Sequence, residues 1–183
     1  MQHKQFLGVL ISTAYLLCMS AQADAPAEGV VTEGVSVPGI ELGSPRALVD
    51  EVYGSPRYCQ SVSYGDRASC TYGVTGGGQV NVRYFGAEGG NAGNSPYDVV
   101  HSVTWYTGVD WVTTAGVTAD MALNNPDELP LRYPNADVTY HHFTGQVFRV
   151  ADYESGISIT RWFNFYTGRT SVYMQIFPGR EVD

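Results

Sequence analysis

Histidine and cysteine side chains are the groups in this 183-residue chain that most directly suggest chemistry. His141 and His142 are adjacent, and adjacent strand residues point to opposite faces, so the two imidazoles cannot share one metal ion. His101 stands apart from them, and the sequence contains neither a His-x-Glu nor a Cys-x-x-Cys spacing. The pattern therefore predicts no metal site and no cofactor.

The acidic residues give little support for hydrolytic chemistry. Asp50 and Glu51 are adjacent, as are Asp127 and Glu128, and both pairs fall on expected helix surfaces, where carboxylates meet solvent or helix ends. The chain has no Gly-x-Ser-x-Gly motif and no phosphate-binding Gly-x-x-x-x-Gly-Lys-Ser/Thr motif. We predict that the protein is not an enzyme, and we keep an uncharacterised enzyme as an alternative.

The first 23 residues have the pattern of a secretory signal peptide. Lys4 gives a short positive start, an apolar run covers 6–19, and Ala21-Gln22-Ala23 is typical of a cleavage site. Cys18 keeps a lipoprotein signal open as an alternative, although the bulky Leu17 precedes it. The sequence predicts an exported protein, periplasmic or extracellular, with no further transmembrane segment.

Cys59 and Cys70 are the two cysteines that follow the signal peptide. Two cysteines in an exported chain predict a disulfide, which would stabilise the fold by about 3 kcal/mol, chiefly by restricting the unfolded chain. Ser63-Tyr64-Gly65-Asp66 between them predicts a hairpin turn. Tyr64 and Asp66 could anchor a partner there or simply form an ordinary turn, and both interpretations stay open.

The net charge of −8 at pH 7 limits the classes of partner. Such a chain will not hold nucleic acid or an anionic membrane surface by charge. A basic protein partner fits this balance better. Every cation after Lys4 is an arginine, the side chain that protein interfaces favour.

Two helical segments must position these residues. Ser44 is expected to cap the first helix, with Pro45 at its first position and Gly54 at its end. The second is expected to begin at Asn125-Pro126, and Pro130 should keep it short. Four runs rich in Val, Tyr and Thr follow each helix. The expected strands are 57–64, 67–74, 78–85 and 98–107, then 136–143, 146–152, 156–166 and 170–178.

Landmarks recur between the two halves of the chain. Gly39 matches Gly116, and the segment 78–85 matches 156–163 about 78 positions later, which favours a tandem duplication. We expect an α+β fold of two tandem repeats, each a short helical segment followed by a four-stranded antiparallel sheet. The sheets join side by side with the helices on one face. The expected organisation is a signal peptide at 1–23, a flexible leader at 24–36, repeat 1 at 37–110 and repeat 2 at 111–183.

Strand alternation indicates a binding surface. In the last strand Val172, Met174 and Ile176 alternate with Tyr173 and Gln175, so the aliphatic set should face the helices and the other set should face outward. Aromatic and arginine side chains on that outward face could hold a protein, although about half of the aromatic residues should belong to the core. The candidate partner-binding residues are Tyr64, Asp66, Arg83, Trp105, Tyr140, Arg161, Trp162, Tyr166 and Tyr173.

The hairpin from Cys59 to Cys70, with Ser63-Tyr64-Gly65-Asp66 between the cysteines, resembles the first-repeat hairpin of the β-lactamase inhibitor protein family. The glycine-rich turn 76–78 follows in the same order as in that family. The resemblance implies a tandem-repeat fold over about 37–178. The helix-plus-strands plan is more remotely similar to the small lipoprotein of the outer-membrane β-barrel assembly machinery.

Two departures limit what the resemblance implies. The family's second repeat usually has its own disulfide, and this chain has no cysteine after Cys70. The family's inhibitory Asp-Tyr pair is replaced here by Gly77-Gly78-Gln79. We expect a protein-binding module that inhibits a hydrolase-type, extracytoplasmic enzyme, with β-lactamase not assured as the target. An envelope assembly or maintenance factor and a carbohydrate-binding protein are the alternatives; the partner's identity and the oligomeric state stay open.

Overall fold

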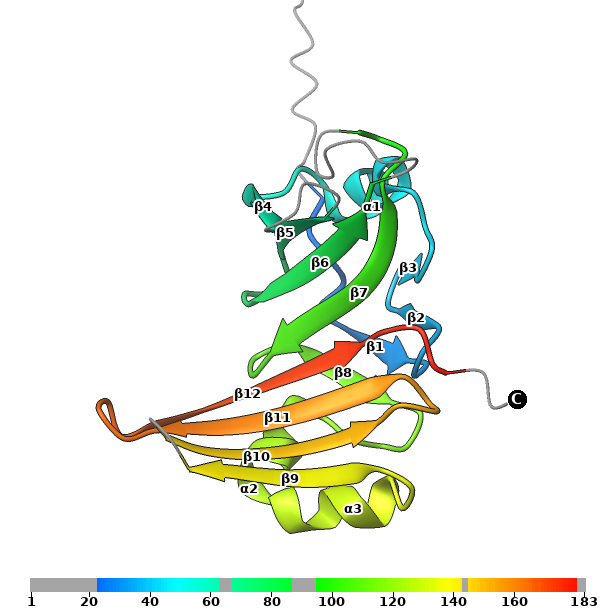
Figure 1. Ribbon diagram of the computed structural model, residues 1–183. Helices are drawn as coiled ribbons and strands as arrows, with labels where there is room; N and C mark the ends of the chain where they lie inside the picture. Colours follow the sequence, from blue (N-terminus) through cyan, green and yellow to red (C-terminus); the bar gives the residue numbers. More distant parts are fainter. Residues whose placement is uncertain (1–22, 63–66, 87–94, 143–144, 181–183) are drawn as a thin grey trace, which may run out of the picture.

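The computed structural model describes residues 23–62, 67–86, 95–142 and 145–180. Its main element is an antiparallel sheet of eight strands in the order β4-β5-β6-β7-β12-β11-β10-β9 (Figure 1). The strands are Tyr58–Val62 (β4), Arg67–Gly73 (β5), Gln79–Phe85 (β6), Val99–Tyr106 (β7), Asp137–His142 (β9), Gly145–Asp152 (β10), Ile157–Asn164 (β11) and Arg169–Ile176 (β12). The expected strands agree with these bounds to within about two residues, the usual spread of strand ends.

The seam of the sheet is the place where β7 pairs with β12. It joins β4–β7, from the first half of the chain, to β9–β12, from the second half (Figure 1). The paired residues are Val103 with Ile176, Thr104 with Gln175, Trp105 with Met174 and Tyr106 with Tyr173. Val172, Met174 and Ile176 are buried, while Tyr173 is partly exposed, so the predicted alternation of this strand is confirmed.

Helix α1, Arg46–Tyr53, covers the first half of the sheet and buries Val49 and Tyr53. The predicted capping role of Ser44 is wrong, because its hydroxyl accepts a hydrogen bond from the Glu41 amide instead. The first helical amides, of Arg46 and Ala47, donate to backbone carbonyls of the segment that leads into β7. Gly54 ends the helix with a φ of 75°, a conformation that glycine adopts without strain.

The second half is covered by a broken helical segment. Helix α2, Ala119–Asn124, was not predicted; its amide at Met121 is capped by the Thr118 hydroxyl. The helix expected from Asn125 begins instead as a 3-10 turn, η2 (Pro126–Glu128), and continues as α3 (Leu129–Arg132). Pro130 interrupts the helical run from η2 into α3, since it has no amide hydrogen to donate to the Pro126 carbonyl, and α3 is a single turn, as expected.

The segment expected as a flexible leader, 24–36, is part of the folded domain. Strand β1, Glu28–Val31, pairs in parallel with β8, Asp110–Thr113, and the side chains of Ala25 and Val31 are buried. Strands β2 (Ser36–Val37) and β3 (Ile40–Glu41) follow as a small antiparallel pair. The expectation was wrong because β1 is short and its partner lies far away in the sequence, so local pattern gave no signal.

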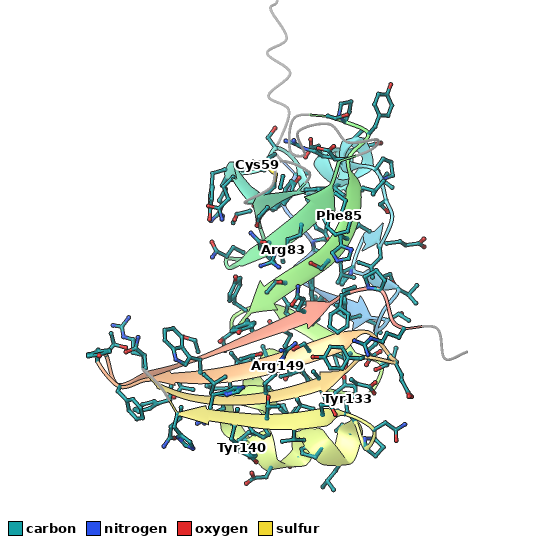
Figure 2. All side chains as sticks on the ribbon, viewed as in Figure 1. Cys59, Arg83, Phe85, Tyr133, Tyr140 and Arg149 are labelled. Atoms are coloured by element: carbon teal, nitrogen blue, oxygen red, sulfur yellow. A yellow bond between two sulfur atoms is a disulfide. The ribbon has the colours of Figure 1, made fainter. Side chains whose placement is uncertain are left out.

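Glu33 holds the turn after β1 against the second half of the chain. Its carboxylate accepts hydrogen bonds from the Thr114 hydroxyl, from the Ala115 amide at 3.2 Å and from the Tyr133 hydroxyl at 3.0 Å. Figure 2 labels Tyr133. Partial burial would raise the pKa of Glu33, but these donors outweigh burial and lower it below its ordinary value of 4.5.

We expect Glu33→Gln to reduce the free energy of unfolding by about 1 kcal/mol at pH 7, because the loss of charged hydrogen bonds is moderated by solvent. The pKa of Glu33 is lowered by folding, so its contribution is present above pH 4.5 and is lost as the pH falls through the folded pKa. Urea denaturation at pH 7 and pH 3 measures this. The difference from wild type should shrink at pH 3, and Glu28→Gln, at an exposed site on β1, is the control. An equal loss at both pH values would contradict the assignment.

One hydrophobic core lies between the helices and the face of the sheet that they cover. Trp105 and Trp111 are fully buried in it, with ring centroids 5.7 Å apart. Beneath α1 the Tyr72 hydroxyl lies 2.7 Å from that of Tyr84 and donates to Asp50 at 2.8 Å. Burial raises the pKa of Tyr72 and Tyr84 far above the ordinary value, so both phenols stay protonated.

The predicted disulfide is confirmed. Cys59 of β4 and Cys70 of β5 face each other in the antiparallel register, and their sulfur atoms are bonded (Figure 2). The bridge fixes β4, which forms one edge of the sheet, to its neighbour β5. Within the described ranges, no helix is long and apolar enough to cross a membrane.

Candidate binding face

The face of the sheet opposite the helices is called the open face here. Its members follow from the strand registers, because cross-strand partners share a face and neighbours along a strand alternate. The open face is rich in hydroxyl, aromatic and arginine side chains. Its residues include Asn81, Arg83, Thr104, Tyr106, His141, Val147, Arg149, Ser158, Thr160, Trp162, Tyr173 and Gln175.

A cavity of about 350 Å³, here called the seam cavity, opens on this face where the two halves of the sheet meet. Arg83 of β6 and Arg149 of β10 line it from opposite sides of the seam (Figure 2). Gln175 of β12 lies between them, and Arg180 lines the cavity from beyond the last strand. A cavity of this size suits a small molecule or one or two side chains of a protein partner.

A second hollow continues from the seam cavity toward β9. It is lined by Arg83, Arg149 and Gln175, which it shares with the seam cavity, and by residues of the second half such as His141 and Tyr173. The two hollows therefore form a continuous depression over the seam. This depression is a feature of the open face that could receive a ligand.

A β-bulge brings one side chain into the seam cavity. The register between β6 and β7 shifts after Arg83, which pairs with Ser102, because Tyr84 pairs with Val100 and His101 is the extra residue. The imidazole of His101 stacks on the Phe85 ring, with centroids 4.0 Å apart and planes 17° from parallel. Bulges often redirect a side chain in this way.

Hydrogen bonds and ring contacts hold the rest of the lining. Arg149 donates its Nε hydrogen to Ser158 Oγ at 2.9 Å, and Gln175 donates Nε2 to Ser102 Oγ at 3.1 Å. The Arg180 guanidinium lies 5.0 Å from the centre of the Tyr153 ring. These contacts fix the side chains before a ligand arrives, which reduces the entropy lost on binding.

Gly156 lets the β10–β11 turn pack against the wall of the cavity. Its φ is 76°, and a Cβ at this position would overlap the Phe177 carbonyl oxygen. The Phe177 amide also donates to the Gly156 carbonyl at 3.0 Å. Phe177 and Tyr153, whose ring centroids are 5.9 Å apart, thereby form an aromatic wall.

The local charge of the depression differs from that of the whole protein. The net charge is −8, yet the described residues that line the two hollows include three arginines and no carboxylate. The ion pair of Arg46 with Asp50 belongs to α1, on the covered face. The net charge predicted a basic partner, whereas this surface is complementary to an acidic group.

Three of the candidate partner-binding residues lie where the open face was expected. Arg83 lines both hollows, Tyr173 lines the second hollow and is 37% exposed, and Trp162 is 36% exposed on β11. Tyr166 is 86% exposed, but it lies in the turn between β11 and β12 rather than on the face. Tyr64 and Asp66 lie outside the described residues.

The assignments of Trp105, Tyr140 and Arg161 to the open face are wrong. Trp105 is fully buried in the core. Tyr140 is exposed, but it shares the covered side of the sheet with Phe148, its cross-strand partner, at a centroid distance of 5.0 Å (Figure 2). Arg161 also points to the covered side, where its Nε donates to the Leu123 carbonyl at 3.2 Å.

The error at Arg161 has a simple cause. Sequence landmarks aligned Arg83 with Arg161, but the buried set of β6 includes Val80 and Val82, and that of β11 includes Ile157 and Ile159. The two strands therefore differ by one residue in phase, and a shift of one residue moves a side chain to the other face.

Sequence reasoning missed Arg149, His101 and Arg180. Arg149 carried a signal, since it stands between the buried residues Phe148 and Val150 in a strand that is otherwise largely apolar. His101 could not be placed, because its position depends on a bulge between two strands. Arg180 lies beyond β12, and its contact with Tyr153 is tertiary.

The arrangement of the open face provides binding groups. Burial first, and then the neighbouring Tyr58 and Tyr173, raise the pKa of Tyr106 at the seam, while Arg83 acts to lower it. Its hydroxyl is therefore a hydrogen-bond donor at neutral pH. Among the described residues, no cluster of three His, Cys, Asp or Glu side chains is placed to hold a metal ion.

Comparison of the chain with protein-family models, with curated proteins and with solved structures gave no match. The resemblance to the β-lactamase inhibitor protein family therefore rests on the residues quoted above. The geometry of the open face is the basis for a proposed function.

Proposed function

We propose that the protein is an exported protein-binding module that inhibits a hydrolase-type, extracytoplasmic enzyme. The partner would sit on the open face, over the depression at the seam. The observation that carries this proposal is the depression itself, which is lined by arginine, aromatic and hydroxyl side chains from both halves of the sheet. Interfaces are enriched in tyrosine, tryptophan and arginine, and their strongest contacts cluster at the centre.

The sheet offers a rigid support for such contacts. Trp162 and Tyr173 project from strands that are hydrogen-bonded on both sides, β11 and β12, so their backbone is already fixed. Aromatic side chains have few rotatable bonds, and little entropy is lost when they are immobilised. They are therefore the expected anchors of the interface, with Tyr106 beside Tyr173 at a centroid distance of 6.5 Å.

The layout of the chain supports the same proposal. Four strands of each half flank the seam, and a helical segment precedes each set, as a tandem duplication would produce. We propose that the two halves are repeats of one unit, in line with the resemblance stated above. The disulfide between Cys59 and Cys70 supports an oxidising, extracytoplasmic location.

The experiment compares three proteins as bait against the extracytoplasmic proteins of the native source. The double variant Trp162→Ala/Tyr173→Ala removes two expected anchors, and Tyr140→Ala is the matched control, an exposed aromatic on the other side of the sheet. Wild type and control should capture the same protein, and the double variant should bind it at least tenfold more weakly once the pair is purified. The wild type should also inhibit the partner's hydrolytic activity.

Two outcomes would contradict the proposal. The double variant could bind a purified partner as tightly as wild type does, which would place the interface elsewhere. A glycan array could instead show specific binding that Trp162→Ala abolishes, and this would favour a carbohydrate-binding protein, because sugar rings stack on exposed aromatic side chains.

A further inference from the structure

The three arginines of the seam cavity are the starting point for a statement about ligand chemistry. Arg83, Arg149 and Arg180 reach it from three separate parts of the chain, so the charge is concentrated by the fold and not by a local sequence run. Within the described residues, no acidic side chain lines the cavity to neutralise them. Three positive charges in one hollow of an acidic protein create a local site for an anion.

The hydrogen bonding of Arg149 indicates which part of its guanidinium faces a ligand. Its Nε hydrogen is already donated to Ser158 Oγ. The two terminal amino groups are therefore the donors that can bind an incoming group. Ser102 Oγ similarly accepts from Gln175, which holds both polar side chains in place. A planar fork of two donors matches the two oxygens of a carboxylate.

The remaining lining of the seam cavity is apolar. Phe85 and the stacked His101 lie on one side, and Tyr153 and Phe177 form the aromatic wall. A small hydrated anion would make no apolar contact with these rings. An anion attached to an apolar body would use both the arginines and the rings.

We propose that the seam cavity binds a carboxylate joined to an apolar body, such as a glutamate side chain beside an aromatic residue on the surface of the protein partner. The inference rests on the proposed function only in assigning the carboxylate to a protein partner. The preference for a carboxylate on an apolar body is argued from the lining of the cavity alone. A carboxylate on an apolar body fits better than a free phosphate, because the two terminal amino groups of Arg149 match the two carboxylate oxygens and the aromatic lining contacts the apolar body.

The test uses small probes and the oxidised full chain, without any partner. The probe is the dipeptide N-acetyl-phenylalanyl-glutamic acid amide, and its counterpart carries glutamine in place of glutamate. Binding is followed by NMR through the side-chain amide of Gln175 and the ring of His101. We expect saturable millimolar binding of the glutamate peptide and at least tenfold weaker binding of the glutamine peptide.

Three variants assign the binding to the cavity. Arg83→Met and Arg149→Met each keep most of the aliphatic volume and remove the guanidinium, so each should weaken binding at least tenfold. Arg169→Met is the matched control, because Arg169 is an exposed arginine at the start of β12 that lines neither hollow. It should bind the glutamate peptide as wild type does.

Several results would overturn the inference. Equal binding of the two peptides would remove the role of the carboxylate, and an equal loss in Arg169→Met would reduce the effect to net charge. Phenyl phosphate binding tenfold more tightly than the glutamate peptide would make this a phosphate site. Probe binding without any captured partner would contradict the proposed function and leave the inference about the cavity in place. Capture of a partner without probe binding would contradict only the inference.

Discussion

Replacing Trp105 with alanine is expected to lower the free energy of unfolding by about 3–5 kcal/mol, the range for truncating a buried tryptophan. Trp162→Ala is expected to change it by less than about 1 kcal/mol, since the indole of Trp162 is partly exposed on the open face. The two tryptophans thus separate a structural role from a binding role. Stabilities of small domains are only about 5–15 kcal/mol, so Trp105→Ala should leave a marginal fold.

The large effect follows from the position of Trp105. It is fully buried at the seam, where it is paired with Val80 of β6 on one side and Met174 of β12 on the other. Its ring also packs against Trp111, whose Nε1 donates to the Pro26 carbonyl at 2.9 Å. Removing the indole would leave a cavity where the two halves of the sheet and the N-terminal segment meet.

Urea denaturation monitored by circular dichroism measures both variants. If Trp105→Ala does not fold, Trp105→Phe provides a smaller truncation, with an expected loss of roughly 1–3 kcal/mol. In a partner-binding assay the larger effect should come from the other tryptophan: Trp162→Ala should bind the partner more weakly, and Trp105→Phe should bind it as wild type does. A Trp105→Phe variant as stable as wild type would show that the seam does not depend on this side chain.

The second large effect is expected from removing the disulfide. The double variant Cys59→Ser/Cys70→Ser should lose about 3 kcal/mol, because the bridge restricts the unfolded chain and its reduction frees that entropy. The loss of stability should be greatest at β4, since β4 is an edge strand paired only with β5 among the described strands. We also expect weaker binding of the partner, if the hairpin contributes to the interface.

Thermal unfolding of the double variant and of wild type, each with and without reductant, measures the effect. Reductant should lower the midpoint of wild type to that of the variant and leave the variant unchanged. A double variant with the midpoint of oxidised wild type would mean that the bridge adds no stability to the hairpin.

The eight strands of the main sheet could be predicted because most of them are rich in β-branched and aromatic residues and lie between turns that contain glycine, proline or asparagine. Helix α1 could also be predicted, because Pro45 precedes it and Gly54 follows it. Elements that depend on distant partners were missed. Strand β1 is stabilised by β8, and α2 is a six-residue helix that packs on β11 and β12, so neither has a strong local pattern.

The candidate site was predicted less well, for a related reason. Alternation in a strand divides its residues into two faces, but only the register between strands tells which face is covered. Tyr173 was assigned correctly, because Val172 and Met174 made the buried side of β12 unambiguous. Arg161 and Tyr140 were not, and the seam cavity depends on a bulge and on arginines brought together by the fold.

The pairing of β1 with β8 has a consequence for the order in which the protein folds. The hydrogen bond from Trp111 to Pro26 joins residues 85 positions apart, and that from Ala115 to Glu33 joins residues 82 positions apart. Long loops must close before such contacts form, whereas the hairpins of the main sheet close short ones. We therefore expect the start of the chain to dock last, on a sheet that has already formed.

This order gives the Glu33→Gln variant a kinetic signature. Interactions that form after the transition state affect unfolding and leave refolding almost unchanged. The variant should therefore unfold faster than wild type and refold at nearly the same rate. The contacts of the N-terminal segment would then form last, and they would determine the unfolding rate of the protein more than its folding rate.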